Sequence, residues 1–327
     1  KEVELDEHRT QIRLSLPTEN QEVVTAIVAA IEALLGDIEG LAPPDIIVER
    51  PHQSAAEQSG AAQGGPQPHA HAHGPKRPEG VARTIAIASG KGGVGKSTVA
   101  SNLAVALVAQ GASVGLLDAD IYGPSVPTMF GVAADQRLGG DEEGRFVPHE
   151  RFGVKLASMG FFVADGAPLI WRGPMLTKAL GQLLGDVDWS GTDYLLVDLP
   201  PGTGDVQMTL TQNLQIDAGI IVTTPQEVAL ADVERGIRMF KEASVPVGGV
   251  IENMSYHICS GCGKRSPVFG EGGGRRVAEQ HGVPFLGGIP LLRAIREGGD
   301  EGRPLSAGPA GGEAGSVFEA LARRLIE

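Results

Sequence analysis

One stretch constrains the fold more than any other: an apolar segment, a glycine-rich loop and a helix-forming segment follow one another between residues 84 and 109. The loop Gly90–Ser97 reads GKGGVGKS, which satisfies the pattern G-x-x-x-x-G-K-[ST]. Thr84–Ala88 predicts a strand before it, and Ser97–Ala109 predicts a helix after it. Glycines let successive N–H groups of such a loop face phosphates at the positive end of the helix. The flanking strand and helix favour a phosphate-binding loop over a glycine-rich turn without a ligand.

From Val81 onward, predicted strands and helices alternate. The predicted strands are Thr84–Ala88, Ser113–Leu117, Val154–Ala157, Tyr194–Val197, Gly219–Thr223, Val247–Ile251 and Phe285–Gly287. The predicted helices are Ser97–Ala109, Met175–Leu184, Val206–Leu214, Val228–Ala243 and Arg275–His281. This alternation predicts an α/β fold with a mostly parallel sheet and helices on both faces. We therefore expect a P-loop NTPase domain over residues 81–327.

A small α+β domain is expected to precede it, over residues 1–50. Val3–Leu5, Gln11–Leu16 and Ile46–Val48 alternate like strands, and a helix is predicted from Asn20. Because this β-β-α-β unit is small and the chain opens with Lys1, we expect it to be incomplete at its N-terminus. Residues 51–80 are rich in Gly, Pro, Gln, Ala and His and predict a flexible linker. The linker histidines, His69, His71 and His73, alternate as a weak metal site would, although a polar linker is the simpler interpretation.

The composition narrows the class of protein. A net charge of −13 argues against a broad nucleic-acid-binding face, which needs a basic surface. No apolar run approaches the length of a membrane span, so we expect no membrane partner. Only two cysteines occur, Cys259 and Cys262, which argues against a disulfide-stapled secreted fold. We expect a cytoplasmic protein with a metal or redox role for the cysteine pair.

Carboxylates stand at the ends of two predicted strands. Tyr194–Asp198 is an apolar strand that ends in a carboxylate, the Walker B pattern, and Asp198 is expected to hold Mg²⁺. In the loop, Lys96 is expected at the β- and γ-phosphates and Ser97 on the magnesium. Asp118 is expected to support the magnesium or its waters, and Asp120 to position the attacking water. Asp120 could instead cap the turn that follows it.

The cysteine pair has a spacing, C-x-x-C, that suits a metal-binding turn. Gly261 and Gly263 permit the turn, and its exposed N–H groups can donate to thiolate sulfurs. Two thiolates cannot complete a four-coordinate metal site, whereas a symmetric dimer supplies four. Lys264 and Arg265 would offset part of the thiolate charge. The spacing alone leaves open an iron–sulfur cluster, a zinc ion and a redox-active dithiol.

These motifs together resemble a known family. Lys91–Thr98 (KGGVGKST) is similar to the deviant Walker A motif of the MinD/ParA/nitrogenase-iron-protein class, which is marked by the additional lysine, Lys91. Further stretches resemble the Mrp/ApbC iron–sulfur carriers: Asp118–Pro127 (DADIYGPSVP), Trp171–Met175 (WRGPM), Asp198–Asp205 (DLPPGTGD), Thr223–Ala231 (TTPQEVALA) and Glu252–Ser255 (ENMS). The resemblance covers essentially all of residues 81–300.

The resemblance implies an ATP-hydrolysing carrier that assembles a [4Fe–4S] cluster on Cys259 and Cys262 of two chains and transfers it to apo-proteins. It implies a homodimer in which Lys91 reaches the partner's phosphates, with ATP, Mg²⁺ and the cluster as cofactors. Apo iron–sulfur proteins and upstream cluster-assembly proteins are the implied partners. The implied catalytic residues are Lys91, Lys96 and Asp120, and the implied magnesium ligands are Ser97, Asp118 and Asp198. The implied nucleotide-binding residues are Gly90, Lys91, Gly92, Gly93, Val94, Gly95, Lys96, Ser97, Thr98 and Asn253, with Asn253 on the adenine.

Three other functions remain alternatives. A MinD/ParA-like positioning ATPase would bind membrane or DNA, and the amphipathic segment Ser316–Ile326 is its best candidate anchor, although this segment is short and expected to pack on the domain. A zinc-binding P-loop ATPase would use the same four thiolates. An electron-transfer ATPase like the nitrogenase iron protein is disfavoured, because the ligands of that protein lie far apart in sequence.

Leu292 departs from the pattern of the Mrp/ApbC family, whose members often carry an acidic residue at this position.

Overall fold

A computed structural model describes residues 2–6, 9–15, 25, 28, 31, 45–49, 75–121, 123–133, 136–162, 173–259, 261–308 and 313–326. The chain divides into two compact units, Lys1–Ala70 and His71–Glu327. Each unit is described by itself below.

The first unit contains a three-stranded sheet with the order β1-β2-β3. β1 (Glu2–Asp6) pairs antiparallel with β2 (Arg9–Ser15), and β3 (Asp45–Glu49) pairs parallel with β2. These strands coincide with the three predicted ones. Most of the helix predicted from Asn20 lies outside the described residues, as do residues 51–74 of the predicted linker with its three histidines.

The second unit is built on an eight-stranded sheet with the order β15-β12-β11-β4-β10-β5-β9-β8, which is parallel except for the edge strand β8. Its strands are β4 (Val81–Ala88), β5 (Val114–Asp118), β8 (His149–Arg151), β9 (Val154–Ser158), β10 (Thr192–Asp198), β11 (Ala218–Thr223), β12 (Val247–Glu252) and β15 (Phe285–Gly288). The central strands are almost continuously apolar because both faces of a parallel sheet are covered. The predicted α/β fold with a mostly parallel sheet is confirmed.

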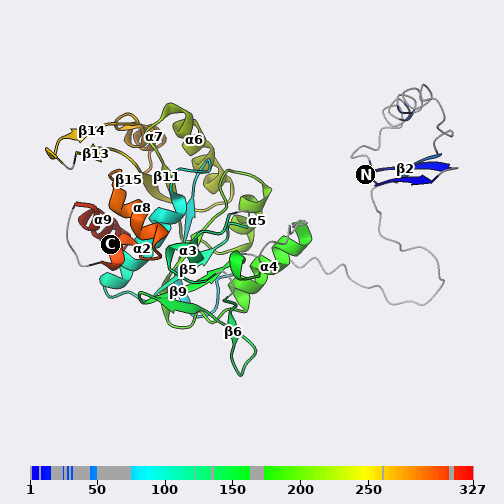
Figure 1. Ribbon diagram of the computed structural model, residues 1–327, viewed down its shortest axis with the longest axis horizontal. Helices are drawn as coiled ribbons and strands as arrows, with labels where there is room; N and C mark the ends of the chain where they lie inside the picture. Colours follow the sequence, from blue (N-terminus) through cyan, green and yellow to red (C-terminus); the bar gives the residue numbers. More distant parts are fainter. Residues whose placement is uncertain are drawn as a thin grey trace. The chain divides into compact units, whose positions relative to one another are not determined.

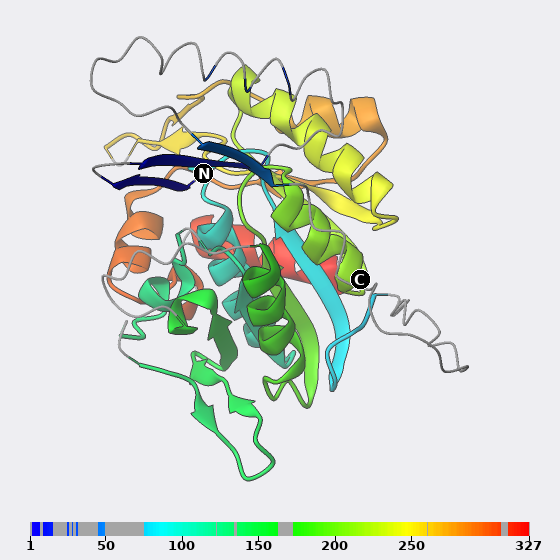
Figure 2. The same ribbon diagram turned by 90° about the vertical axis from the view of Figure 1, so that its right-hand side faces the viewer.

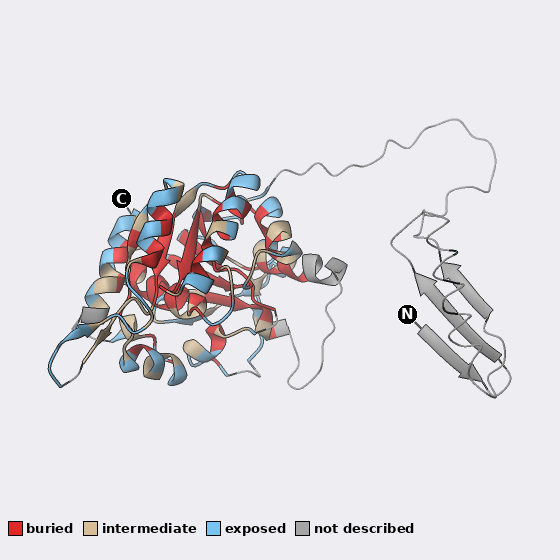
Figure 3. Ribbon diagram, turned by 90° about the horizontal axis from the view of Figure 1, so that it is seen from above, coloured by how far each residue is buried: buried red, intermediate tan, exposed pale blue. Residues whose placement is uncertain are grey.

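Helices cover both faces of this sheet (Figure 1). One face carries α2 (Lys96–Ala109), α3 (Val126–Met129), α8 (Arg293–Asp300) and α9 (Glu313–Ile326). The other face carries α4 (Gly173–Gly185), α5 (Asp205–Asn213), α6 (Glu227–Glu242) and α7 (Gly273–His281). Side chains of β4 alternate between the two apolar cores: Ile85 and Ile87 pack toward α2, whereas Ala86 and Ala88 pack toward the opposite layer. Buried residues accordingly concentrate in the sheet and on the inner sides of the helices (Figure 3).

Some elements differ from the sequence prediction. Residues 75–80, predicted as the end of the linker, belong to the second unit: Lys76 N–H donates to Asn213 O and Lys76 O accepts from Gln215 N–H, at 3.0 Å each. The helices α3 and α8 and the hairpin β6 (Gly139–Gly140)–β7 (Phe146–Val147) were not predicted. Figure 2 shows this hairpin extending away from the sheet. None of the described helices combines the length and the apolar character that a bilayer span requires.

Candidate functional site

The candidate site lies where β4, β10 and β5 end side by side. In the register of these parallel strands, Asp198 at the end of β10 is opposite both Ile87 of β4 and Asp118 at the end of β5. The loop Gly90–Gly95 follows β4 directly and leads into α2. The topology therefore brings the predicted phosphate loop and both acidic strand ends to one edge of the sheet, as expected for this fold.

Two glycines of the loop are required by close approaches. A Cβ at Gly90 would lie 2.2 Å from Cβ of Asp232 on α6, so the loop begins against that helix. Gly95 has a left-handed backbone (φ 82°), and a Cβ there would lie 2.2 Å from Nδ2 of Asn253. A residue with a side chain would be strained at Gly95 both by its backbone and by this contact.

The loop is otherwise open, as a phosphate cradle must be. A Cβ added at Gly92 or at Gly93 would meet no described atom within 4 Å. Gly95 precedes the first turn of α2, and no side chain among the described residues caps that turn. The first N–H groups of the helix therefore carry unused donor capacity next to the open loop, which suits an anionic phosphate.

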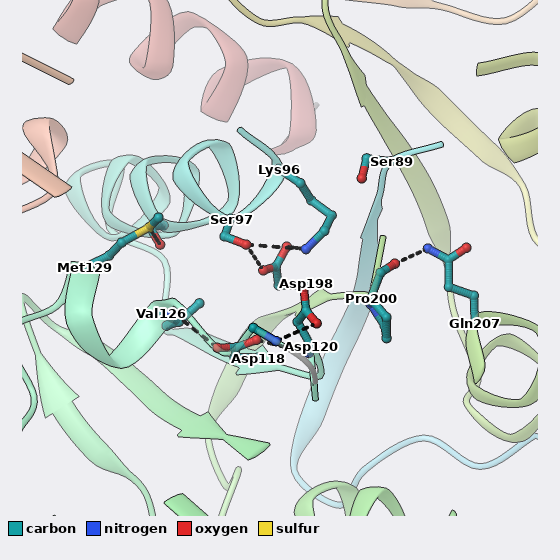
Figure 4. A network of polar contacts seen from close by, with 12 residues as sticks. Ser89, Lys96, Ser97, Asp118, Asp120, Val126, Met129, Asp198, Pro200 and Gln207 are labelled. Carbon is teal, nitrogen blue, oxygen red and sulfur yellow. Dashed lines mark hydrogen bonds and ion pairs between the residues drawn. The ribbon is translucent and has the colours of Figure 1, made fainter. Parts of the chain in front are cut away.

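Lys96 and Ser97 both contact Asp198 (Figure 4). The ammonium of Lys96 donates to Oδ1 of Asp198 at 2.7 Å, and Ser97 Oγ donates to Oδ2 at 2.5 Å. The side chains of Lys96 and Asp198 are only 5% and 0% exposed. Burial raises the pKa of Asp198, and the nearby ammonium of Lys96 opposes that shift. In this structure the predicted phosphate lysine and the predicted magnesium ligands form one buried cluster.

Asp118 is a second buried carboxylate in the same cluster. Its Oδ1 accepts from the N–H of Asp120 and its Oδ2 from the N–H of Val126, both at 3.1 Å (Figure 4). Its Oδ2 also accepts from Ser158 Oγ at 3.1 Å. Burial raises its pKa from 3.8 to about 7, and the negative charge of Asp198 adds to the shift. A divalent cation would neutralise the repulsion between the neighbouring carboxylates of Asp118 and Asp198. Their oxygen atoms therefore fit the expected magnesium ion.

Asp120 lies just beyond the end of β5 and is 9% exposed. Its Oδ1 accepts a hydrogen bond from Gly123 N–H at 3.3 Å, so the turn role that the sequence offered as an alternative is present. Since Asp120 also lies beside the acidic cluster, the turn role does not exclude its predicted role toward water.

A cavity of about 430 Å³ opens beside the loop and α2. Its lining includes Gly95, Thr98 and Asn253 from the predicted nucleotide site, together with Met129, Met254, Leu291, Leu292 and Arg296. Nδ2 of Asn253 donates to the carbonyl of the buried Val94 at 2.8 Å, so the predicted adenine contact is held against the loop. The mixture of apolar walls and a few polar groups suits a flat heteroaromatic base.

Lys91 is partly exposed at the start of the loop, and its side chain makes no ion pair with any residue that the structure describes. Its carbonyl accepts a hydrogen bond from Ser89 Oγ at 3.0 Å, which anchors its backbone. The contact of Lys91 with a partner chain, which the family resemblance implies, stays a prediction.

The cysteines lie between β13 (His257–Ile258) and β14 (Arg265–Ser266), two short antiparallel strands. We call residues 257–266 the cysteine hairpin; it projects from the body of the second unit (Figure 1). Cys259 N–H donates to Lys264 O at 3.0 Å, and Gly263, with φ 69°, donates to Cys259 O at 2.8 Å. Cys262 is exposed and Cys259 is partly exposed.

The hairpin favours the thiolate form of Cys259. N–H groups of Gly261 and Cys262 donate to its sulfur and lower its pKa, and the thiol of Cys262 adds a third hydrogen bond. Within the described part of the chain, no third histidine, cysteine or carboxylate joins the pair to form a metal-binding group. One chain therefore presents two cysteine sulfurs, and no further candidate ligand among the described residues, at this surface.

Three contributors to the site escaped the sequence analysis. Ser158 ends β9 and bonds Asp118, and the rule that parallel strands end at one edge would have identified it. Gln207 on α5 donates from Nε2 to the carbonyl of Pro200, in the loop after Asp198, while its buried Oε1 has no described partner. Glu252, buried at the end of β12, accepts hydrogen bonds from Ser255 and Gly274. No motif marks Gln207, and the ENMS stretch that begins with Glu252 does not indicate these contacts, because both roles depend on tertiary neighbours.

Known proteins share both the fold and much of the sequence. The family profile described as NUBPL iron-transfer P-loop NTPase, of the ParA group, matches residues 80–326. An iron-sulfur cluster carrier protein of Pseudomonas fragi is 49% identical over 242 residues, which cover 74% of this chain and 84% of that protein. A mitochondrial iron-sulfur protein of Arabidopsis thaliana, required for NADH dehydrogenase, is 46% identical over 277 residues, or 84% and 86% of the two chains. The chain spans only 66% of the length of the carrier from Escherichia coli, to which it is 48% identical over 246 residues and 75% of its own length.

Solved structures agree with this relationship. A nucleotide-binding protein of Archaeoglobus fulgidus, solved with ADP, has a TM-score of 0.62 and 38% identity and covers 71% of this chain and 90% of its own. The cell division ATPase MinD of Pyrococcus furiosus has a TM-score of 0.54 over 75% and 98% of the two chains, at 23% identity that supports the fold alone. With a phosphate loop, two buried acidic strand ends and a surface cysteine pair in the matched region, the chain belongs to the ParA/NUBPL family of iron-transfer P-loop NTPases.

Proposed function

We propose that this protein binds and hydrolyses ATP and carries a [4Fe–4S] cluster, bridged between two chains, to apo-proteins. The observation that carries the proposal is the presence, in one chain of this family, of an open phosphate loop beside buried carboxylates and of an exposed C-x-x-C hairpin. The names of the similar proteins, iron-sulfur cluster carriers, support the same cargo.

The nucleotide half of the proposal rests on the loop and the two strand ends. Backbone N–H groups of residues 90–97 would bind the phosphates, with Lys96 at the β- and γ-phosphates and the base in the cavity beside Asn253. Ser97, Asp118 and Asp198 would hold Mg²⁺, which neutralises charge on the phosphates when bound. Asp120 would orient the water that attacks the γ-phosphorus, and Lys91 would contact the phosphates bound by the partner chain.

The cargo half rests on the incomplete ligand set. Cys259 and Cys262 offer two thiolates, whereas a four-iron cluster takes four. A homodimer with a two-fold axis at the hairpin would supply the other pair. A cluster bound between two surfaces can be reached by an acceptor, which suits transfer to apo iron–sulfur proteins and loading by upstream assembly proteins. ATP hydrolysis would change the geometry of the dimer, and the proposed location is the cytoplasm.

Cluster transfer tests the proposal. Protein reconstituted without air with iron and sulfide is mixed with an apo-enzyme whose activity requires a [4Fe–4S] cluster, with and without Mg·ATP. We expect the enzyme to gain activity faster than free iron and sulfide can provide, including in the presence of an iron chelator. The double variant Cys259→Ala/Cys262→Ala should hydrolyse ATP but activate no enzyme. Activation by the double variant at the wild-type rate would refute the carrier function.

A further inference from the structure

A short, fully tethered segment joins the nucleotide cavity to the cysteine hairpin. It runs from Asn253, whose amide contacts the phosphate loop, to Cys259. We call residues 253–258 the strap. Six residue steps separate Asn253 from Cys259, so at most about 22 Å of extended chain joins them.

The first end of the strap is part of the nucleotide site. Asn253 is 6% exposed, donates to Val94 O at 2.8 Å, and fills the space that a side chain at Gly95 would need. Its own N–H donates to Thr223 O at 2.7 Å, which ties it to β11. Met254 follows with φ 54°, and both residues line the cavity.

The middle of the strap is tied to the neighbouring strand and helix. Ser255 N–H donates to Ile289 O at 2.9 Å, and Ser255 Oγ donates to the buried Glu252 at 2.5 Å. The other carboxylate oxygen of Glu252 accepts from Gly274 N–H, at the start of α7, at 2.6 Å. Ser255 also lies so close to Gly288 that a Cβ there would be 2.7 Å from its hydroxyl.

The far end of the strap is bonded to Leu291, a residue that lines the cavity. Leu291 N–H donates to Tyr256 O at 2.7 Å, and Leu291 forms a bridge with His257, the first residue of β13. Leu291 also lines the cavity. A nucleotide in the cavity would therefore contact Asn253 and Met254 of the strap, and Leu291, which is bonded to its far end. From that end β13 leads directly to Cys259.

Met254 gives the strap a point at which it can change conformation. A residue with a side chain rarely adopts a positive φ, and such a conformation persists only where its surroundings impose it. At Met254 those surroundings are the cavity and the phosphate loop. A change there would rotate the backbone that enters Ser255 and the cysteine hairpin.

We propose that the strap couples the two sites, so that a nucleotide in the cavity changes the position of Cys259 and Cys262 within the same chain. This inference rests on the proposed nucleotide site. Ser255 is its central positioning residue, because its hydroxyl fixes the strap to Glu252 without lining the cavity. Coupling of this kind requires an element that both sites bias, and the strap is in contact with both.

The test measures the alkylation rates of Cys259 and Cys262 by iodoacetamide in the cluster-free full chain, with and without saturating Mg·ADP. Sedimentation velocity verifies that the samples are monomeric, so that burial between two chains does not contribute. We expect Mg·ADP to change the rate of at least one cysteine by about fivefold in the wild-type chain. In Ser255→Ala that change should fall below about twofold, the smaller coupling expected once the anchor is lost.

Ser306→Ala is the matched control. It also removes one serine hydroxyl that donates to a buried side chain, Asn102, but lies outside the strap. This variant should keep the fivefold change. A full change in Ser255→Ala, or none in a wild-type chain that binds Mg·ADP by calorimetry, would overturn the coupling alone. A wild-type chain that binds no Mg·ADP would overturn the proposed nucleotide site and the coupling with it.

A second measurement covers the case in which Ser255→Ala does not fold. Hydrogen–deuterium exchange of the wild-type chain should change on addition of Mg·ADP in peptides that cover residues 254–263. Exchange in the hairpin β6–β7, which is remote in sequence from the loop and the strap, serves as the internal reference. Unchanged exchange over residues 254–263 with ADP bound would contradict the coupling.

Discussion

Gly95 is the residue on which the nucleotide cavity depends most directly, because its backbone is left-handed and its α-carbon abuts the amide of Asn253. Gly95→Ala adds backbone strain and a steric conflict, and we expect the free energy of unfolding to fall by about 2–5 kcal/mol. Gly92→Ala is the control, since its added Cβ meets no described atom, and it should change that free energy by less than about 0.5 kcal/mol. Urea denaturation measures both; equal effects would contradict the close approach.

Asp118 should give the metal-free protein a characteristic pH dependence. Its pKa is raised from 3.8 to about 7 in the folded chain, so between these values the folded state keeps a proton that the unfolded state releases. Its contribution to stability is therefore fully present below about pH 4 and is lost as the pH rises to about 7. The unfolding free energy of the wild type minus that of Asp118→Asn, measured in EDTA, should decrease as the pH rises over this range and then level off. A difference independent of pH would contradict the raised pKa.

At the scale of elements, α9 packs on the phosphate-loop helix α2 with the apolar face predicted from the sequence. Phe318 and Leu321 on that face are 0% and 2% exposed. Leu321→Ala should lower the free energy of unfolding by about 2–5 kcal/mol, measured by urea denaturation. Ile326 is 39% exposed, so Ile326→Ala should change the free energy of unfolding by less than about 1 kcal/mol. Cosedimentation of the full chain with anionic vesicles would instead favour a membrane-positioning role for this helix.

The elements that the sequence predicted are those with a strong local signal. Buried parallel strands such as Tyr194–Val197 are continuous apolar runs, and the structure extends them by only a few residues. Helix α8 was missed because its sequence, RAIREGGD, contains two glycines and only one buried residue, Ile295. The four-residue helix α3 and the two-residue strands of the β6–β7 hairpin are too short for a periodic pattern.

The residues of the site likewise divide into those that a local motif predicts and those that only the tertiary structure shows. The loop, the acidic strand ends and the cysteine pair carry motifs, and the topology places the first two together. The ion pair of Lys96 with Asp198 and the hydrogen bonds of Ser158 and Glu252 join residues far apart in sequence. Their partners are set by how the strands align in the sheet, which no local pattern encodes.

For the molecule as a whole, a variant at Lys91 can distinguish a nucleotide-bridged dimer from an ATPase that works within one chain. Lys91→Ala should bind Mg·ADP as the wild type does, since the cradle and Lys96 are intact. ATP hydrolysis should fall by about a hundredfold or more, and ATP-dependent dimerisation should be lost, because the charge supplied to the partner's phosphates is missing. Phosphate release and sedimentation velocity measure these effects, with the exposed Lys241→Ala as the control. Normal hydrolysis by Lys91→Ala would show that no lysine acts across the interface.

If two chains share one cluster through Cys259 and Cys262, the iron content of the reconstituted dimer will show it. Iron, sulfide and zinc are determined in anaerobically reconstituted protein alongside its mass in solution. We expect one four-iron cluster per dimer, about two irons per chain, and none in either single cysteine-to-alanine variant. Four irons on an isolated monomer, or stoichiometric zinc in protein purified without air, would contradict it.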